Sequence, residues 1–217
     1  MILSKTEADA VKALITALEA RTGAQVVTAV IGKADAYVEL PWKAFALGAA
    51  LAGLGVVIAD WLRPDWLTAY AALLHVLAIL GAAAASALVA IFVPAYARLF
   101  LRTTRRDSEV RHYAESLFLR RKLFKTQSRN GILVLVSVFE RKVEILADSG
   151  LHDRVGDPDW RTVIARMTPH LAAGRPAEAL RQGLERLEEL LVAKGLHGTP
   201  VQKNELADRP IEERGAK

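Results

Sequence analysis

The sequence predicts an α/β domain that is interrupted by a transmembrane helical hairpin. Three observations lead to this fold class: one long apolar stretch, β-branched apolar segments on both sides of it, and amphipathic helical segments that accompany those strands. Because two membrane crossings return the chain to the side that it left, the parts before and after the apolar stretch can complete one folded domain.

The apolar stretch covers residues 44–97 and contains two arms, 44–62 and 67–97, joined by the turn-like tetrad Arg63-Pro64-Asp65-Trp66. A helix rises about 1.5 Å per residue, so about 20 apolar residues cross a hydrocarbon core of about 30 Å. The first arm reaches this length and the second exceeds it. We expect Pro94 to end or kink the regular helix of the second arm.

A buried helical pair in a soluble protein is the alternative interpretation of these arms. The membrane is favoured because neither arm has a polar stripe and because Trp42, Trp61 and Trp66 fall at the predicted boundaries, where amphipathic rings settle. His75 in the second arm is expected to form a packing hydrogen bond to the first, with a proton relay as the alternative. Close packing is expected along small residues at helical spacing: Gly48, Ala52, Gly55, Gly81 and Ala85.

Charge predicts the orientation of the hairpin. The chain carries a net charge of +5, but between Arg98 and Arg129 ten lysines and arginines stand against three acids, a net charge of +7. Basic residues directly after a membrane helix indicate the cytoplasmic side. We therefore expect an inner-membrane protein with both termini in the cytoplasm. The basic segment can also attract anionic lipid headgroups, so it could sense the lipid surface. Binding to nucleic acid is the alternative use of such a basic cluster, and we do not expect it. The N-terminus lacks the features of a signal peptide.

Before the hairpin, the sequence predicts one helix and one strand. Ser4 and Glu7 have the spacing of a capping box, and apolar residues recur at helical spacing until Gly23, a C-terminal stop. Residues 24–31 are apolar on both faces, as in a central strand that is covered on two sides. A linker, residues 32–41, leads into the hairpin.

After the hairpin, the sequence predicts helices around a second pair of strands. The helix of the second arm is expected to continue through residues 98–106 into an amphipathic segment with Val110, Ala114 and Leu117 on one face. Residues 132–138 and 142–147 form an antiparallel hairpin through a turn that contains Glu140. Two helices follow: one starts at Asp157-Pro158 with Asp157 as N-cap, and the other starts at Pro176 and ends at Gly195.

These elements divide the chain into four regions. An isolated strand at 24–31 would leave its backbone groups unpaired, so we expect it to join the later strands in one sheet. The predicted regions are 1–41 as the first part of the α/β domain, 42–98 as the transmembrane hairpin, 99–197 as the second part, and 198–217 as a charged, disordered tail.

The soluble parts resemble the TPM domain family. The segments that carry the resemblance are KTQSRNGILVLVS (125–137), ADSGLHDRVGDPDW (147–160) and ALEARTGAQVVTAVI (17–31), and it covers roughly residues 1–32 and 107–195. It implies a compact α/β/α sandwich with a small mixed sheet. It also implies two kinds of activity: acid phosphatase, attributed to a plant member, with a divalent cation near acidic loop residues, or roles in photosystem repair and receptor association. Glu140 stands where the family usually has Asp.

Candidate site residues lie in the loops that flank the later strands. Asp148, Asp153, Asp157 and Asp159 are spaced within a dozen residues, and such oxygen ligands suit Ca²⁺ or Mg²⁺, which could bind phosphate, with Asp148 as the catalytic carboxylate. The alternative is that Asp157 caps a helix and the others are solvated.

Two further groups in these loops have open roles. Arg129 and Asn130 could bind an anion or form a turn, with Asn130 in left-handed geometry. His152 could act as an acid or base or be an exposed loop residue. Glu140 is expected to be a turn residue.

Other activities find no support in the sequence. The chain contains no cysteine, which excludes disulfides, thiolate catalysis and cysteine-ligated zinc. It also contains no P-loop, dinucleotide-binding glycine motif, H-E-x-x-H or G-x-S-x-G. Two functions remain, and whether the chain is an enzyme stays open: a membrane-anchored TPM-like domain that binds or helps to assemble or maintain a membrane protein complex, or a divalent-metal-assisted phosphatase.

Overall fold

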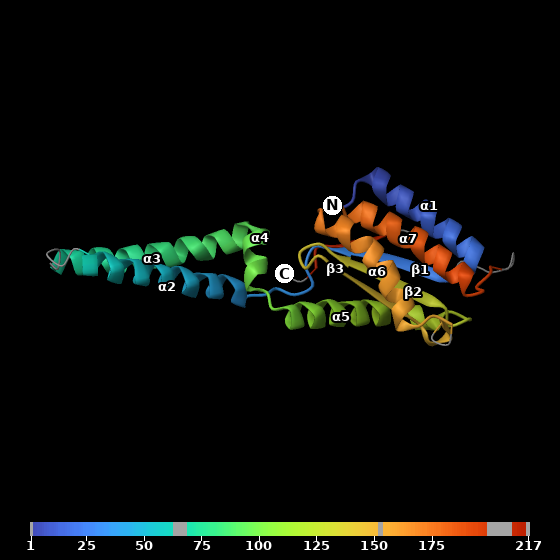
Figure 1. The fold of residues 1–217 in the computed structure, drawn as a ribbon. Helices are drawn as coiled ribbons and strands as arrows, with labels where there is room; N and C mark the ends of the chain where they lie inside the picture. The colour runs from blue at the N-terminus through green and yellow to red at the C-terminus, as the bar shows by residue number, and fades with distance from the viewer. Residues whose placement is uncertain (1, 63–68, 152–153, 199–209, 216–217) are drawn as a thin grey trace. The chain divides into compact units, whose positions relative to one another are not determined.

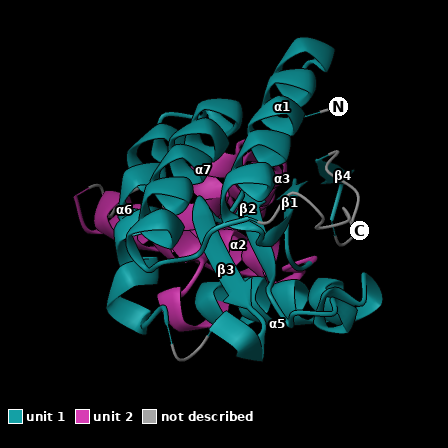
Figure 2. Ribbon diagram, turned by 90° about the vertical axis from the view of Figure 1, so that its right-hand side faces the viewer, with its two compact units in different colours: residues 1–35, 106–217 teal, residues 36–105 magenta. Residues whose placement is uncertain are grey.

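The computed structural model describes residues 2–62, 69–151, 154–198 and 210–215, and the chain divides into two compact units. Unit 1 consists of residues 1–35 and 106–217, and unit 2 of residues 36–105 (Figure 2). Unit 2 is thus inserted into the sequence of unit 1. The sequence predicts this insertion at residues 42–98, and in the structure it spans residues 36–105.

Unit 1 is organised around a four-stranded mixed sheet with the strand order β3-β2-β1-β4. Its strands are β1 (Gln25–Ile31), β2 (Gly131–Ser137), β3 (Lys142–Ala147) and β4 (Ile211–Glu213). β1 and β2 are parallel, in a register that pairs Gln25 with Gly131, and β2 and β3 are antiparallel. The predicted pairing across the inserted unit is confirmed: strands about one hundred residues apart form the centre of one sheet.

Helices cover both faces of this sheet, as the fully buried residues of β1 and β2 require. α1 (Lys5–Thr22), α6 (Asp157–Ala172) and α7 (Pro176–Ala193) pack on one face, and α5 (Thr103–Arg120) and the short helix η3 (Leu123–Lys125) pack on the other (Figure 1). Alternate residues of β1 and β2 belong to the two resulting cores. The fold is therefore the expected α/β/α sandwich with a small mixed sheet.

The helix ends confirm most of the capping predictions. The Ser4 hydroxyl accepts from the Glu7 amide at 3.2 Å, the Glu7 carboxylate accepts from the Ser4 amide at 2.7 Å, and Gly23 ends α1 at φ 71°. The prediction of Asp157 as an N-cap is wrong. Gly156 is the N-cap of α6, because the Asp159 carboxylate reaches back to the Gly156 amide at 3.1 Å and leaves Asp157 as the first helical residue.

The predicted disordered tail needs a correction at residues 211–213, which form β4. This strand pairs in parallel with the end of β1, and the Gly32 amide donates to the Glu213 carbonyl at 3.1 Å. The side chain of Glu212 also accepts from the Ile2 amide at 2.8 Å. Composition alone missed this strand because its backbone partners come from the other end of the chain. The rest of the predicted tail, residues 199–209 and 216–217, lies outside the described residues.

Unit 2 contains α2 (Glu39–Leu62), α3 (Ala69–Phe92), α4 (Pro94–Ala97) and the short helix η2 (Arg98–Phe100). α2 and α3 lie side by side (Figure 1). Both are long and apolar enough to cross a membrane: the mean hydropathy of their most apolar windows is 1.9 and 2.3, and 0% and 11% of those windows are buried. The tetrad at 63–66 lies outside the described residues.

The prediction for the end of the second arm is confirmed, because α3 ends at Phe92, two residues before Pro94. His75 lies next to α2, with Nε2 3.5 Å from Asp60 Oδ1. Of two further predictions for these helices, one is wrong and the other holds only in part. The helix does not continue through residues 98–106, because Leu101 has extended backbone angles between η2 and α5. Of the predicted packing glycines, only Gly48 approaches the other helix closely, while a side chain at Gly55 or Gly81 would meet open space.

Candidate functional site

Three of the residues that the sequence singles out, Arg129, Asn130 and Asp148, lie together at one edge of the sheet in unit 1. Arg129 and Asn130 directly precede β2, and Asp148 directly follows β3. The two strands are antiparallel and pair Ile132 with Ala147, which brings the start of β2 to the end of β3. The loops at this edge are tied together, because the Asp148 amide donates to the Gly131 carbonyl at 2.9 Å.

Arg129 and Asp148 neutralise each other. Arg129 Nε lies 2.9 Å from Asp148 Oδ2; the Asp148 side chain is only 5% exposed, whereas that of Arg129 is about half exposed, at 52%. The other carboxylate oxygen, Oδ1, accepts from the Ser149 amide at 2.7 Å. The sequence predicted ligands of opposite charge for the two side chains, a cation for Asp148 and an anion for Arg129. The structure brings them together as one partly buried ion pair.

Asn130 connects the starts of the two central strands. Its buried side-chain amide donates to the Gly23 carbonyl at 2.6 Å, and its backbone amide donates to the Thr126 hydroxyl at 3.1 Å. The positive φ of this turn, 50°, belongs to Arg129, so the expectation that Asn130 adopts the left-handed geometry is wrong. The side-chain amide thus holds the end of α1 against the start of β2.

The predicted metal ligands do not gather in the described part of the chain, where no group of three or more His, Asp or Glu side chains could hold a metal ion. Asp157 is exposed at the start of α6. Asp159 lies 2.6 Å from Lys194 Nζ, and this hydrogen bond, with that from Gly156, lowers the pKa of Asp159 below its ordinary value. His152 and Asp153 lie outside the described residues.

A pocket of about 250 Å³ opens at the same edge of the sheet. It contains two exposed side chains that sequence reasoning missed, Arg154 and His197, which come from opposite ends of the segment that contains α6 and α7. No local pattern could have paired them, because only the fold brings the end of α7 to the loop after β3. The complete lining consists of Thr22, Gly23, Ser128, Asn130, Gly150, Leu151, Arg154, Gly195, Leu196 and His197.

Glu140 has a structural position at the opposite edge of the sheet. Its side chain is 2% exposed, and one carboxylate oxygen accepts from the Ala34 amide at 2.8 Å while the other bonds to the Ser137 hydroxyl. The predicted turn between β2 and β3 is therefore confirmed. The carboxylate fixes this turn to the segment that follows β1.

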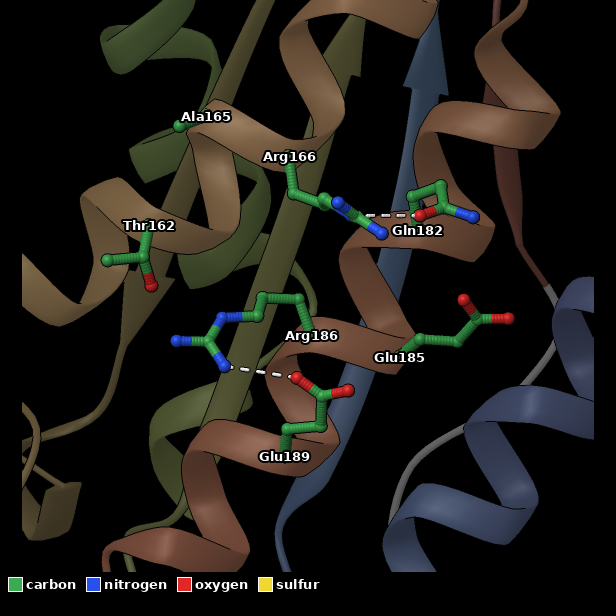
Figure 3. Close-up of a pocket in the computed structure, with 7 residues that line it drawn as sticks. All are labelled: Thr162, Ala165, Arg166, Gln182, Glu185, Arg186 and Glu189. Atoms are coloured by element: carbon green, nitrogen blue, oxygen red, sulfur yellow. Dashed lines mark hydrogen bonds and ion pairs between the residues drawn. The ribbon is translucent and has the colours of Figure 1, made fainter.

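A second, larger hollow of about 530 Å³ lies on the outer surface of α6 and α7 (Figure 3). Arg166 of α6 donates to Gln182 of α7 at 3.0 Å, and within α7 Arg186 donates to Glu189 at 3.0 Å. The hollow contains none of the residues that the sequence singled out. Its side chains tie the two helices together at their solvent-facing surface.

The sequence profile of the TPM domain matches residues 80–190, about half of the chain. The chain belongs to the TPM domain family. The match begins within α3 and extends through β2 and β3 to most of α7. The N-terminal α1 and β1 lie outside it, but in the structure of this TPM domain protein β1 pairs with β2 in the sheet and α1 covers one face of it.

One solved structure supports the fold of this TPM domain protein over nearly its whole length. It is the NMR structure of the BA42 protein from the psychrophilic bacterium Bizionia argentinensis, with a TM-score of 0.59 and 15% sequence identity over 97% of this chain and 95% of that chain. At this identity the likeness shows the fold alone. Among curated proteins, no relative matches this chain.

Proposed function

We propose that α2 and α3 anchor this TPM domain protein in a membrane and that unit 1 binds, and helps to assemble or maintain, a membrane protein complex. The observation that carries the proposal is the surface of unit 2, where large apolar side chains stay exposed along both helices. Examples are Leu51, Val57, Leu73 and Leu77, which are 60%, 65%, 58% and 57% exposed. A helical pair with such a surface is stable in lipid and not in water.

The fold supports a hairpin that crosses the membrane twice. Because β1 precedes the hairpin and β2 follows it, and because the two strands pair along their whole length, both flanking segments belong on one side of the membrane. The basic segment 98–129 favours the cytoplasmic side.

A binding role for unit 1 is favoured over catalysis by the state of the candidate carboxylates. Asp148 is engaged by Arg129, and Asp159 by Lys194. A carboxylate in such a pair is less available as a metal ligand or nucleophile, because the ion pair would have to break first.

The absence of cysteine from the chain makes the topology directly testable with single-cysteine variants. Asp9→Cys on α1, Arg161→Cys on α6 and Asp65→Cys between the hairpin helices would be labelled in intact cells with a membrane-impermeant maleimide. We expect Asp65→Cys to react at once and the other two to react only after the membrane is permeabilised. Reaction of Asp9→Cys and Arg161→Cys from opposite sides would overturn the proposed anchoring.

Binding to a membrane protein complex is tested by site-specific photo-crosslinking in native membranes. A photoreactive residue would replace Arg154 at the strand-edge pocket or Arg166 at the hollow between α6 and α7. We expect at least one position to give a discrete adduct with an integral membrane protein, while Ile58, on the exposed surface of α2, is the lipid-facing control. If no exposed position of unit 1 gives such an adduct, the binding role is wrong.

The second candidate is a divalent-metal-assisted phosphatase, and the observation that favours it is the pocket at the edge of the sheet where β3 ends and Asp148 follows. The test measures hydrolysis of a generic phosphomonoester by the full chain in detergent, with Ca²⁺, Mg²⁺ or a chelator. Metal-dependent turnover that Asp148→Asn abolishes, and that the remote Asp9→Asn leaves intact, would favour the enzyme. Turnover that is absent under all conditions would leave the binding role as the proposal.

A further inference from the structure

The strand-edge pocket of about 250 Å³ in unit 1 has a buried floor. The buried residues of its lining are Thr22, Gly23, Asn130, Leu151 and Leu196. The Thr22 hydroxyl donates to the Leu18 carbonyl at 2.8 Å. The Asn130 side-chain amide donates to the Gly23 carbonyl at 2.6 Å. Because these bonds hold the floor within unit 1, the pocket has its shape before any ligand binds.

The floor of this pocket offers hydrogen-bond acceptors. Asn130 uses its side-chain nitrogen for Gly23, while its Oδ1 accepts no hydrogen bond from any residue that the structure describes. α1 ends at Thr22 and α7 ends at Ala193, so the carbonyl ends of two helices, which carry partial negative charge, lie at the pocket. A ligand group on this floor therefore needs an N–H or O–H donor. Phosphate is disfavoured there, because phosphates bind at the opposite, amino ends of helices.

The rim of the same pocket is basic. Arg154 and His197 are exposed residues of the lining, and neither takes part in an ion pair within the described parts of the chain. The described lining contains no Asp or Glu, and Asp148, the acid that follows β3, is held by Arg129 at 2.9 Å. A guanidinium presents a planar fork of donors that matches the two oxygens of a carboxylate. The rim therefore favours an anionic group, above a floor that favours a donor.

The size of the pocket limits how much of a ligand it can hold. Pockets that enclose a drug-sized molecule have about 300–1,000 Å³, so a pocket of about 250 Å³ accommodates a smaller molecule or the end of a chain. Leu151 and Leu196 supply apolar surface beside the polar groups. The last residue of a polypeptide fits these requirements, because it combines a carboxylate, an adjacent backbone N–H and one side chain.

We infer that the strand-edge pocket binds the C-terminal residue of a partner polypeptide, with the carboxylate at Arg154 and His197 and the backbone N–H at Asn130 Oδ1. The inference rests on the proposed binding role of unit 1 and names the part of the partner that unit 1 recognises. Capture of a C-terminal carboxylate is an established mode of peptide recognition. A free N-acylated amino acid has the same chemistry, so the experiment separates these two sources.

The first test uses N-acetyl amino acids, which reproduce the last residue of a chain. The isotope-labelled full chain in detergent micelles is titrated with N-acetyl-alanine and N-acetyl-leucine, and each acid is compared with its primary amide, which lacks the charge. We expect saturable shifts of the Gly150 and Leu196 amide signals in nuclear magnetic resonance spectra. The Kd of the acid should be at least about tenfold lower than that of the amide, the factor that corresponds to about 1.5 kcal/mol for a hydrogen bond to a charged group. Absence of saturable shifts, or equal Kd values for acid and amide, overturns the inference.

Two double variants distinguish binding at the rim from a general effect of charge. R154Q/H197Q should abolish the preference for the acid over the amide, and because both side chains are exposed, circular dichroism should show an unchanged fold. R161Q/R175Q, which changes two exposed basic residues of unit 1 outside the pocket lining, should keep the preference. A preference that survives in R154Q/H197Q, or that is lost in R161Q/R175Q, overturns the inference.

A longer peptide and inorganic phosphate separate the possible ligands. An acetylated tetrapeptide of three glycines and a C-terminal leucine should bind at least as tightly as N-acetyl-leucine. Binding that is about tenfold weaker would show that the pocket excludes chains, which overturns the inference. Tighter binding of inorganic phosphate than of either acid would also overturn it and would favour the phosphatase.

Failure of this inference is distinguishable from failure of the proposed function. If the acids do not bind while photo-crosslinking from unit 1 still gives an adduct with a membrane protein, only the role of the pocket is wrong. If no exposed position of unit 1 gives an adduct, the binding role itself is wrong.

Discussion

Arg129 and Asp148 show that the role of a charged residue depends on its neighbour. Each has the chemistry of a ligand-binding residue when it is read alone, a guanidinium beside a turn and a carboxylate after a strand. In the fold they lie 2.9 Å apart, and Asp148 is almost completely buried. A buried carboxylate that loses its partner strongly destabilises the folded state. The first role of Arg129 is therefore to compensate the buried negative charge of Asp148.

At the same edge, Asn130→Ala should lower the free energy of unfolding by about 1–3 kcal/mol, because the buried Gly23 carbonyl loses its donor. Denaturant titrations followed by circular dichroism measure this loss. The control is Ser128→Ala in the same loop, where the side chain is exposed and little change is expected. Equal stability of the two variants would contradict the structural role of Asn130.

Glu144 on β3 is expected to make stability depend on pH in the opposite sense to most carboxylates. Burial raises its pKa, although Lys142 and Arg111 nearby favour the charged form. Because its folded-state pKa is raised, Glu144 makes its full contribution to the free energy of unfolding below its unfolded-state pKa, about 4.3. This contribution is lost as the pH rises through the folded-state pKa.

Glu144→Gln should therefore raise the free energy of unfolding at pH 7 and have no effect below about pH 4, where Glu144 is protonated in both states. Urea titrations over this pH range measure the difference from the unchanged chain. Glu189→Gln on the solvent-facing surface of α7 is the control and should bring no gain at pH 7. A gain from Glu144→Gln that is the same at every pH would contradict the role of ionisation.

At the scale of elements, two glycines of the same hairpin helix, α2, have different surroundings. A Cβ added at Gly48 would lie 2.8 Å from Ser86 Cβ and 2.9 Å from the Ala82 carbonyl oxygen, whereas one added at Gly55 would meet nothing within 4 Å. Spacing alone could not separate the two cases, because it gives the face of a helix only to within about one residue. The actual crossing point depends on the side chains of both helices.

Alanine substitutions at these two glycines should have opposite effects. Gly48→Ala should destabilise the helical pair by about 1–3 kcal/mol through overpacking. Gly55→Ala should stabilise it by up to about 1 kcal/mol, since alanine is the better helix former. Unfolding of the full chain in mixed micelles by increasing fractions of a denaturing detergent measures both. If the two variants change stability equally, Gly48 is not at the point of closest approach.

At the scale of the whole molecule, unit 1 is assembled from three separate parts of the sequence. The first part supplies β1, the central part β2 and β3, and the C-terminal part β4. Glu212 of β4 accepts from the Ile2 amide, and Glu213 bonds to the Tyr113 hydroxyl of α5. The C-terminal strand thus fastens the N-terminus and α5 to the edge of the sheet.

Deletion of residues 210–217 should expose the edge of β1. The Gly32 amide loses its acceptor on Glu213 and should exchange its hydrogen up to about tenfold faster, the factor that corresponds to a net hydrogen bond of about 0.5–1.5 kcal/mol. Hydrogen exchange with mass spectrometry of peptides that contain Gly32 measures the rate. Deletion of residues 216–217 alone should leave it unchanged, and equal rates in the two deletions would contradict the role of β4.

The amino-acid sequence determined the elements whose signal is local. The β-branched run of β1, the capping box at Ser4 and the apolar arms of the hairpin follow from propensity, hydrogen-bonding groups and length, which act over a few neighbouring residues. Even the pairing of β1 with β2 could be predicted, because a lone apolar strand has no other way to satisfy its backbone groups.

Only the tertiary structure decided which side chains meet. It paired Arg129 with Asp148 and Lys194 with Asp159, brought Arg154 and His197 to one pocket, and gave the end of the charged tail a place in the sheet. The physical reason is that these contacts join segments that are far apart in the chain. Their energy depends on distances and burial that no local pattern contains.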